Sequence, residues 1–394
     1  MMDRVAANPG RMRITPESGD PAFYATLEMA DNPSVDGTPL NKASLLQDTT
    51  AGALGLDGTA TVNDAFVGVL KKLGLTPVFL TVTVAGKTAK AGIRINGVTN
   101  ADGSQLTTDG KTDTYLCFSA TTSVSASVSG YMDLANKSIS GTAPSVGILR
   151  LTLALSAPTG QTKKYTSSAS GIKFSPYVSK IDICCIGGGG GGGGARGRNN
   201  STTYSAGGGG GGGRLVNQHD VPISANQEYA VVVGAGGSGG QTSGGMPTDG
   251  VAGGASMVRI PNSTILAQAD GGGKGVRGDY YETNGASLMG TGGAGNGAGG
   301  PGGANGSPQT DGSVFGSSSN GSAGGGGGGG NGSGGSPYGG NGGNRNSSEA
   351  EAGKGDGGGG GGGYHLSPAT ESTLYSGAKG HSGAVYLRWE VDLA

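Results

Sequence analysis

The chain has 394 residues, of which 89 are glycine, and its 26 basic and 27 acidic residues give a net charge of −1. This balance lacks the positive excess typical of proteins that bind nucleic acid or an anionic membrane, and no apolar run reaches the roughly 20 residues of a membrane-spanning helix. Glycine is concentrated in the second half: residues 187–394 hold 71 of the 89 glycines. Side chains for an ordinary hydrophobic core are therefore mainly available before residue 187.

The cysteines and the first residues of the chain indicate the cellular compartment in which the protein is made. Met1 to Val5 lack the apolar core of a secretory signal. Of the three cysteines, Cys184 and Cys185 are adjacent in a strand-like stretch, which indicates neither a disulfide framework nor a metal-binding pair. We expect a protein made in a reducing cytosol and kept there, or assembled there into a particle.

Residues 1–75 are predicted to form a short helical segment for attachment or oligomerisation. Thr61 is a suitable N-cap, and the apolar residues after it recur at helical spacing, namely Val62, Ala65, Phe66, Val69, Leu70 and Leu73. Residues 39–46 are compatible with one short helical turn. Because one apolar face is too little core for a free-standing domain, this helix should dock on a partner or fold back on the next domain.

Residues 76–157 are predicted to form a β-sandwich. Alternating or β-branched stretches are separated by the turn signals Asp102-Gly103 and Asp109-Gly110, and they comprise residues 78–84, 92–98, 115–118, 124–128 and 148–155. Short strands at this spacing are typical of a sandwich. Residues 83–103 and 129–131 resemble the prealbumin-like sandwich of carboxypeptidase regulatory modules, which implies a spacer or binding module.

Residues 158–394 alternate ordinary strands with glycine-only runs. The strands are expected at 181–186, 214–216, 229–233, 256–260 and 384–389, and the runs are 187–194, 207–213, 324–330 and 357–363. Glycine-rich sequence without a strict period is commonly disordered, because an ordered glycine costs about 0.5–1 kcal/mol more than alanine. Against disorder, the runs have nearly equal lengths and apolar strands punctuate the region to its end.

The ordered alternative is a bundle of extended helices with three residues per turn. Such helices form no internal hydrogen bonds, and side-by-side packing close enough to join them leaves no room for a β-carbon. Interior helices would need glycine at every position and outer helices only at inward-facing positions. The fold expected overall is mainly β: a short helical N-terminal segment, a β-sandwich, and packed polyglycine II helices with flanking β-strands.

The region from Tyr165 to Trp389 resembles the glycine-rich domain of bacteriophage tail proteins, including the receptor-binding adhesins at the tail-fibre tips of T-even-like phages. Residues 181–194, 227–236 and 383–389 carry this resemblance, and residues 9–11 and 37–42 resemble the start of tail structural proteins in phages of Gram-positive bacteria. The resemblance implies a virion protein, made in the host cytoplasm, whose N-terminal segment joins other tail or baseplate proteins. Loops at the end of the polyglycine bundle would contact a glycan or protein on the bacterial surface. A homotrimer and a single-chain tip on a trimeric shaft both remain open.

The candidate receptor-binding residues lie in loops between glycine stretches. Rigid aromatic side chains among small polar residues suit recognition, although each tyrosine could instead cap the bundle, and half of the loops should face the tail. The candidates are Arg196, Arg198, Tyr204, Arg277, Asp279, Tyr280, Tyr281, Phe315, Tyr338, Tyr364, His365 and Tyr375.

Catalytic and cofactor motifs have little support. Residues 233–239 fit the glycine spacing of a dinucleotide site, but no helix can follow them, and the tripeptide Arg277-Gly278-Asp279 is too short to indicate integrin binding. The three histidines have no metal-ligand spacing, and neither a nucleophile elbow nor a carboxylate pair is visible. We therefore expect no enzyme activity, cofactor or metal. The alternatives to an adhesin are a structural tail or baseplate component and a cellular glycine-rich surface protein.

Overall fold

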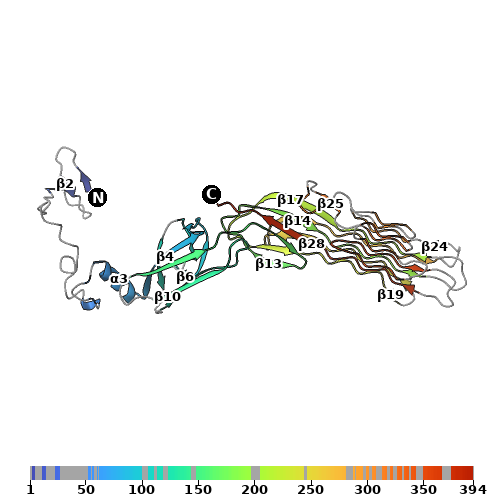
Figure 1. Cartoon of the computed structure of the whole chain (residues 1–394), viewed down its shortest axis with the longest axis horizontal. Coiled ribbons are helices and arrows are strands. Elements are labelled where there is room, and N and C mark those ends of the chain that lie inside the picture. Colours follow the sequence, from blue (N-terminus) through green and yellow to red (C-terminus); the bar gives the residue numbers. More distant parts are fainter. Residues whose placement is uncertain are drawn as a thin grey trace. The chain divides into compact units, whose positions relative to one another are not determined.

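The computed structural model separates into two compact units, Met1–Pro77 with Pro144–Ile148, and Val78–Ala143 with Leu149–Ala394 (Figure 1). Each unit is described by itself. The structure describes residues 2–4, 11–14, 23–26, 52–54, 56, 60, 62–99, 105–110, 113–118, 123–142, 148–196, 205–243, 246–280, 287–288, 290–295, 299–300, 304–307, 313–316, 320–322, 326–330, 332–336, 339–342, 349–365 and 374–393.

The first unit contains the predicted helix and a small sheet. Helix α3 spans Val62–Lys72 and has the acidic Asp64 in its first turn, where the positive end of the helix dipole favours a carboxylate. Ala65 and Val67 are buried, whereas Phe66, Val69 and Leu73 are exposed. The helix is thus confirmed, with part of its apolar stripe uncovered.

The small sheet of the first unit was not predicted from the sequence. It is antiparallel, in the order β1-β2-β3, with bounds Met2–Arg4, Arg11–Ile14 and Phe23–Thr26. The turn predicted at residues 39–46 and the N-cap Thr61 lie outside the described residues.

Two sheets share the core of the predicted sandwich. One has the order β10-β9-β6-β7 and the other β11-β4-β5, with β8 also pairing with β4. The bounds are β4 Leu75–Val84, β5 Lys87–Thr88, β6 Arg94–Thr99, β7 Gln105–Thr107, β8 Asp113–Phe118, β9 Ser123–Val128, β10 Lys137–Thr142 and β11 Leu149–Leu155. Residues alternate between buried and exposed along β11, as the period of two in its sequence predicts.

The sandwich core is formed by strands of both sheets. Leu80 of β4 and Leu153 of β11 are buried with Ile95 and Ala126 from the opposite sheet, and with Ile93, which precedes β6. Strands β4 and β11 pair in parallel, which requires a crossover, supplied here by the strands between them. The resemblance to prealbumin-like modules stays a prediction.

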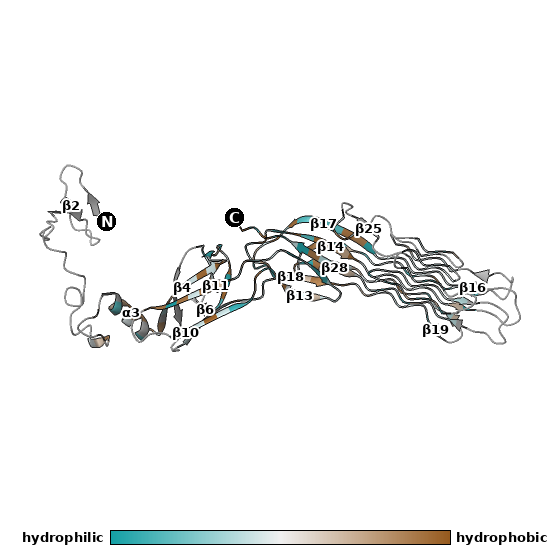
Figure 2. Ribbon diagram, in the orientation of Figure 1, coloured by the Kyte–Doolittle hydropathy of each residue, from teal (hydrophilic) through white to brown (hydrophobic). Residues whose placement is uncertain are grey.

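Two further sheets form the base of the glycine-rich domain. One has the order β12-β28-β14-β17-β25 and the other β13-β18-β21-β22. Their bounds are β12 Gln161–Tyr165, β13 Ala169–Ile172, β14 Lys180–Ile186, β17 Arg214–Pro222, β18 Tyr229–Val232, β21 Ser256–Arg259, β22 Ile265–Ala269, β25 Asn320–Ser322 and β28 Ala384–Trp389. Brown, hydrophobic residues mark strands such as β14 and β28 (Figure 2), and their buried side chains form one core with those of β18, β21 and β22.

The glycines that follow β14 are bonded to their neighbours in three directions. Successive amides of Gly187–Gly194 donate to three different segments in rotation, at 2.8–3.1 Å. The acceptors are the carbonyls of Arg214, Gly211 and Gly208 for the first segment, Gly254, Val251 and Thr248 for the second, and His381 and Ala378 for the third. Three other segments donate back to carbonyls of the same run, through Gly237 and Gly240, Gly272, Gly275 and Gly278, and Gly360 and Gly363. A strand in a sheet has two neighbours; this run bonds to six segments.

This packing requires glycine. A β-carbon built on any residue from Gly187 to Gly193 would lie 1.9–2.2 Å from a neighbouring carbonyl oxygen. In the outer segment 234–241, the glycines have the same close contacts, whereas every third residue, Ala235, Ser238 and Gln241, is exposed. The pattern matches the expectation that interior segments need glycine throughout and outer segments only at inward positions.

Candidate functional site

Four short strand pairs gather at the end of the glycine segments that lies opposite the two base sheets (Figure 1). They are β15 Ala195–Arg196 with β27 Leu374–Tyr375, β16 Ser205–Ala206 with β26 Tyr364–His365, β19 Thr242–Ser243 with β20 Met246–Pro247, and β23 Asp279–Tyr280 with β24 Ser287–Leu288. We call this group the loop end. Because the chain reverses direction here, four of the predicted loops share one end of the domain.

The loop end begins where the close packing of glycine relaxes. A β-carbon on Gly194 would lie 3.3 Å from its nearest neighbour, the carbonyl oxygen of Tyr375. Side chains can therefore return at the next residue, and both Ala195 and Ala206 are fully buried there. The length of the glycine run after β14 thus determines how far the loop-end side chains lie from the base sheets.

Six candidate residues lie on the paired strands of the loop end, namely Arg196, Asp279, Tyr280, Tyr364, His365 and Tyr375. Tyr364 is only 7% exposed and pairs with Ala206, which is the burial expected of a capping residue. Tyr375 pairs with Ala195 and is half-buried, and Arg196 beside it is also half-buried. Tyr375 and Arg196 therefore remain accessible, and Tyr364 is mostly covered.

Arg277 and Asp279 lie at the same end, and Arg277 contacts Asp249, an acidic residue that the sequence had not indicated. The Asp249 carboxylate accepts from the Arg277 amide at 3.0 Å and from Lys274 Nζ at 2.9 Å. Arg277 also donates from its guanidinium to the carbonyl of Pro247 at 3.3 Å. Burial opposes ionisation of Asp249, but the hydrogen bonds and charges of Arg277 and Lys274 outweigh it and hold the pKa of Asp249 below its usual value.

The structure separates Phe315 from the loop end. Phe315 packs against Cys184, Ile186 and Leu215 of the base sheets, with the Arg388 guanidinium 4.5 Å from its ring centre. From the sequence, Phe315 could not be distinguished from the other candidates, because the loops at the two ends of the glycine segments have similar composition. Phe315 therefore belongs to the core beside the base sheets.

The remaining candidates lie wholly or partly outside the described residues. Tyr280 lies in β23 and His365 in β26, and their side chains are outside the description. Four candidates lie outside the described residues altogether: Arg198, Tyr204, Tyr281 and Tyr338.

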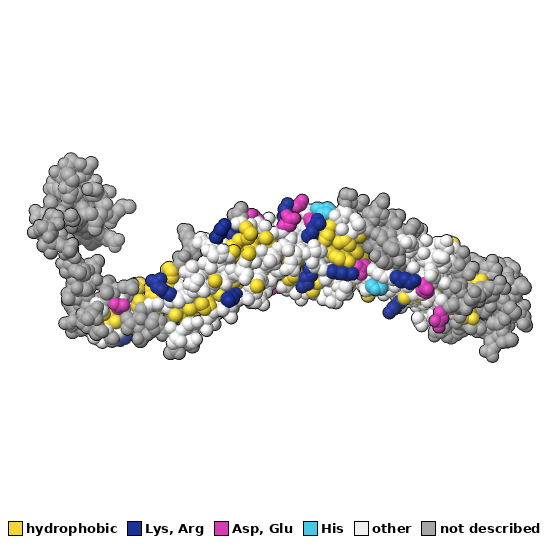
Figure 3. All heavy atoms as spheres, in the orientation of Figure 1, with side chains coloured by type: hydrophobic (Ala, Val, Ile, Leu, Met, Phe, Trp, Pro, Cys, Tyr) yellow, Lys and Arg dark blue, Asp and Glu magenta, His cyan; other side chains and the backbone are white. Residues whose placement is uncertain are grey.

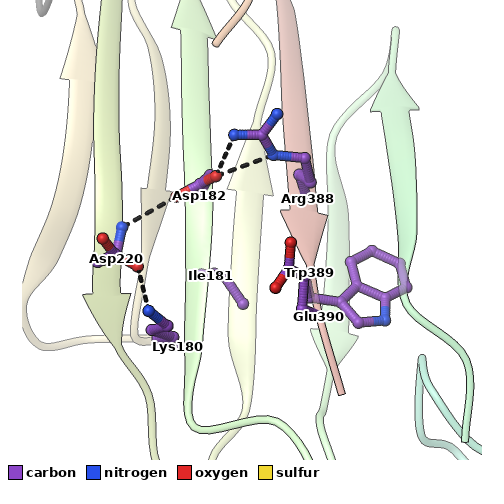
Figure 4. Close-up of a pocket in the computed structure, with 7 residues that line it drawn as sticks. All are labelled: Lys180, Ile181, Asp182, Asp220, Arg388, Trp389 and Glu390. Carbon is purple, nitrogen blue, oxygen red and sulfur yellow. Dashed lines mark hydrogen bonds and ion pairs between the residues drawn. The ribbon is translucent and has the colours of Figure 1, made fainter. Parts of the chain in front are cut away.

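A second cluster of charged residues lies on the base sheets (Figure 4). Arg388 donates to Asp182 at 2.9 and 2.5 Å, the Asp220 amide donates to the same carboxylate at 2.9 Å, and Lys180 lies 2.6 Å from Asp220. Burial of Asp182 opposes its ionisation, yet these donors lower its pKa. The cluster lines a hollow of about 90 Å³. Because these charges pair with one another, the cluster joins β14, β17 and β28.

Charge elsewhere is mixed, and the described residues offer no metal centre. On the face shown in Figure 3, basic and acidic side chains are interspersed. No group of three or more His, Cys, Asp or Glu side chains that could hold a metal occurs in the described part of the chain. Within the same residues, no helix is long and apolar enough to cross a membrane.

The comparison with known families decides the classification. A model described as a glycine-rich domain matches residues 165–390, which is more than half of the chain. The chain belongs to this glycine-rich domain family. The family match begins at the last residue of β12 and ends just after β28, so it coincides with the base sheets and the glycine segments between them. A search of curated proteins finds no match.

Proposed function

We propose that this chain is a bacteriophage tail receptor-binding protein that adsorbs to the bacterial surface through its loop end. The observation that carries the proposal is the gathering of four loops at one end of a glycine core whose amides bond in three directions. Such a core holds the ends of the loops in place, and the loops are free to vary in sequence. The resemblance of residues 165–389 to phage adhesins supports the same assignment.

We infer further that the glycine segments are polyglycine II helices. The rotation of hydrogen-bond partners every third residue fits a helix with three residues per turn, and an eight-residue run would span about 25 Å. Amide hydrogen exchange tests this: Gly188–Gly193 should exchange as slowly as the amides of β14. Rapid exchange across the run would contradict it.

Binding would be non-covalent. Tyr375, Arg196, Arg277 and Asp279 are the described loop-end candidates that remain accessible. They offer aromatic contact area, hydrogen-bond donors and a carboxylate acceptor. Several copies per virion, as a trimer or as single tips on a trimeric shaft, would raise avidity without new contacts. Residues 1–75 would attach the chain to other tail or baseplate proteins, in a virion assembled in the host cytoplasm.

The alternative is a non-adhesive structural component of the tail or baseplate. The pairing of Lys274 with Asp249 favours it, because the charges are satisfied within the domain instead of being offered to a ligand. In that case the bundle would act as a stiff building block. A cellular glycine-rich surface protein is a weaker alternative that nothing in the described structure favours.

Purified protein distinguishes these functions. A fluorescently labelled adhesin should bind cells of a susceptible bacterial strain and reduce phage adsorption in a dose-dependent manner. A structural component should do neither, while antibodies against it should still label virions. Labelling of neither cells nor virions would remove both phage assignments.

A further inference from the structure

Two tyrosines join the β-sandwich to the glycine-rich domain. The hydroxyl of Tyr131, in the sandwich, donates to Asn226 of the glycine-rich domain and accepts from the Arg94 amide at 2.9 Å. In the other direction, Tyr177 of the glycine-rich domain packs in the sandwich core, and its hydroxyl accepts from the Lys90 amide at 3.0 Å. Tyr177 therefore places its ring in the core of the other domain, and Tyr131 reaches the glycine-rich domain through its hydroxyl.

A buried polar pair lies beside the tyrosines. Asp133, 2% exposed, accepts from the amide of Ser175 at 3.0 Å and from its hydroxyl at 2.5 Å. Ser175 is fully buried, and its hydroxyl in turn accepts from the Tyr177 amide at 3.2 Å. A buried polar group without a hydrogen-bond partner destabilises the fold. Separating the two domains would leave Asp133 of the sandwich without the hydrogen bonds that Ser175 of the glycine-rich domain donates to it.

Hydrogen bonds also hold the chain segment that links the two domains, around Thr159. The Thr159 amide donates to the carbonyl of Asp133, and the indole of Trp389 donates to the carbonyl of Thr159, each at 2.9 Å. The Met132 amide adds a bond to the Lys173 carbonyl at 2.9 Å. A hinge needs backbone free to change its dihedral angles, and the middle of this connection is held from both sides.

We propose that the β-sandwich and the glycine-rich domain form one rigid body, in which the sandwich fixes the direction of the loop end. This differs from the spacer expected from the sequence, and it does not depend on what the loop end binds. Domains of one chain ordinarily move relative to each other unless their interface is large and hydrophobic. Here the Tyr177 ring in the sandwich core, the Tyr131 hydroxyl, the buried Asp133 carboxylate and a hydrogen-bonded connection take that role.

Double electron–electron resonance on the full chain tests the proposal. Spin labels at the exposed positions Ser138→Cys and Ser263→Cys, one in each domain, report the distance between them; the background carries Cys117→Ser, and Cys184 and Cys185 are buried. One narrow distance distribution is expected. A broad distribution in this otherwise unaltered chain would overturn the proposal.

Two variants identify the cause of the rigidity. The double variant Tyr131→Phe with Asn226→Ala removes the hydrogen bonds made by Tyr131 Oη and Asn226, and it should lose the single narrow peak. Tyr165→Phe is the matched control, because the buried Tyr165 hydroxyl has no hydrogen-bond partner among the described residues, and it should keep that peak. Equal distributions in the control and the double variant would show that these bonds do not fix the domains, and circular dichroism would confirm that both variants fold.

Discussion

The Gly190 amide donates to the carbonyl of Gly211 at 2.8 Å, in the centre of the glycine segments. The carbonyl of Gly190 accepts from Gly360 at 2.9 Å, and a β-carbon on Gly190 would lie 1.9 Å from the carbonyl oxygen of Gly273. One residue therefore joins two segments and contacts a third. Backbone atoms fill the space that side chains fill in an ordinary core.

Gly190→Ala should destabilise the glycine-rich domain strongly. The methyl group would meet backbone on a segment bonded on several sides, so the cost should reach the upper end of overpacking, about 3 kcal/mol or more. Denaturant unfolding would measure it. Ser238→Ala, at an exposed outward position, is the control and should change stability by less than about 0.5 kcal/mol. Similar stability of the two variants would contradict the close packing.

The C-terminal strand should be essential for the domain. Strand β28 lies between β12 and β14, and Leu387 is fully buried in their common core. Leu387→Ala should cost about 2–5 kcal/mol, whereas Leu393→Ala, at a residue 54% exposed, should have little effect. Thermal unfolding measures both, and a tolerated Leu387→Ala would argue against the central position of β28.

Local pattern was enough to predict the helix and the apolar strands. The spacing from Val62 to Leu73 is helical, and the alternation from Ile148 to Leu155 reflects one buried face. The structure has α3 and β11 there, although Phe66, Val69 and Leu73 of the helix are exposed. The missed strands β10 and β12 are mostly exposed and polar. Their pairing partners, rather than their own side chains, make them strands.

The candidate site was predictable only in part. Sequence located Arg277, but Asp249 and Lys274 were missed because their contact depends on which outer segments lie side by side. One signal was available: Lys274 and Arg277 are three residues apart, the spacing of outward positions. Phe315 lies beside the base sheets because β25 pairs with β17 and the Phe315 amide donates to the Asn217 side chain. The sequence could not place it there, because turn-rich loops look alike at both ends of the bundle.

Stability should fall in acid partly through Asp182. Its carboxylate accepts from Arg388 and from the Asp220 amide, which lowers its pKa from the usual 3.8. A lowered pKa in the folded state stabilises the fold above the unfolded value, and this stabilisation is lost as pH falls through the folded value. Asp182→Asn should thus cost about 1–2 kcal/mol near neutral pH, and the difference from the unaltered chain should shrink as pH falls below the usual value of 3.8. Unfolding measured across pH checks this, and a constant difference would contradict it.

The adjacent cysteines should be unreactive in the folded protein. Burial raises the pKa of Cys184 to about 12 and that of Cys185 above its usual range, so little thiolate forms near neutral pH. Mass spectrometry after iodoacetamide treatment should find both unmodified in the native chain and modified in denaturant. Rapid native modification would show that the base sheets open.

Loop replacement tests the central claim most directly. Residues 281–286 join β23 to β24 at the loop end, and residues 366–373 join β26 to β27; each would be replaced by Gly/Ser sequence of the same length. Residues 308–312, which lead to Phe315 beside the base sheets, serve as the control replacement. The chains are compared for labelling of a bacterial strain that the unaltered chain binds, after unfolding curves have shown equal stability. We predict that one or both loop-end replacements abolish labelling while the control retains it. Full labelling by both loop-end replacements, and also by a chain with Arg196→Ala, Arg277→Ala and Tyr375→Ala, would contradict receptor binding at the loop end.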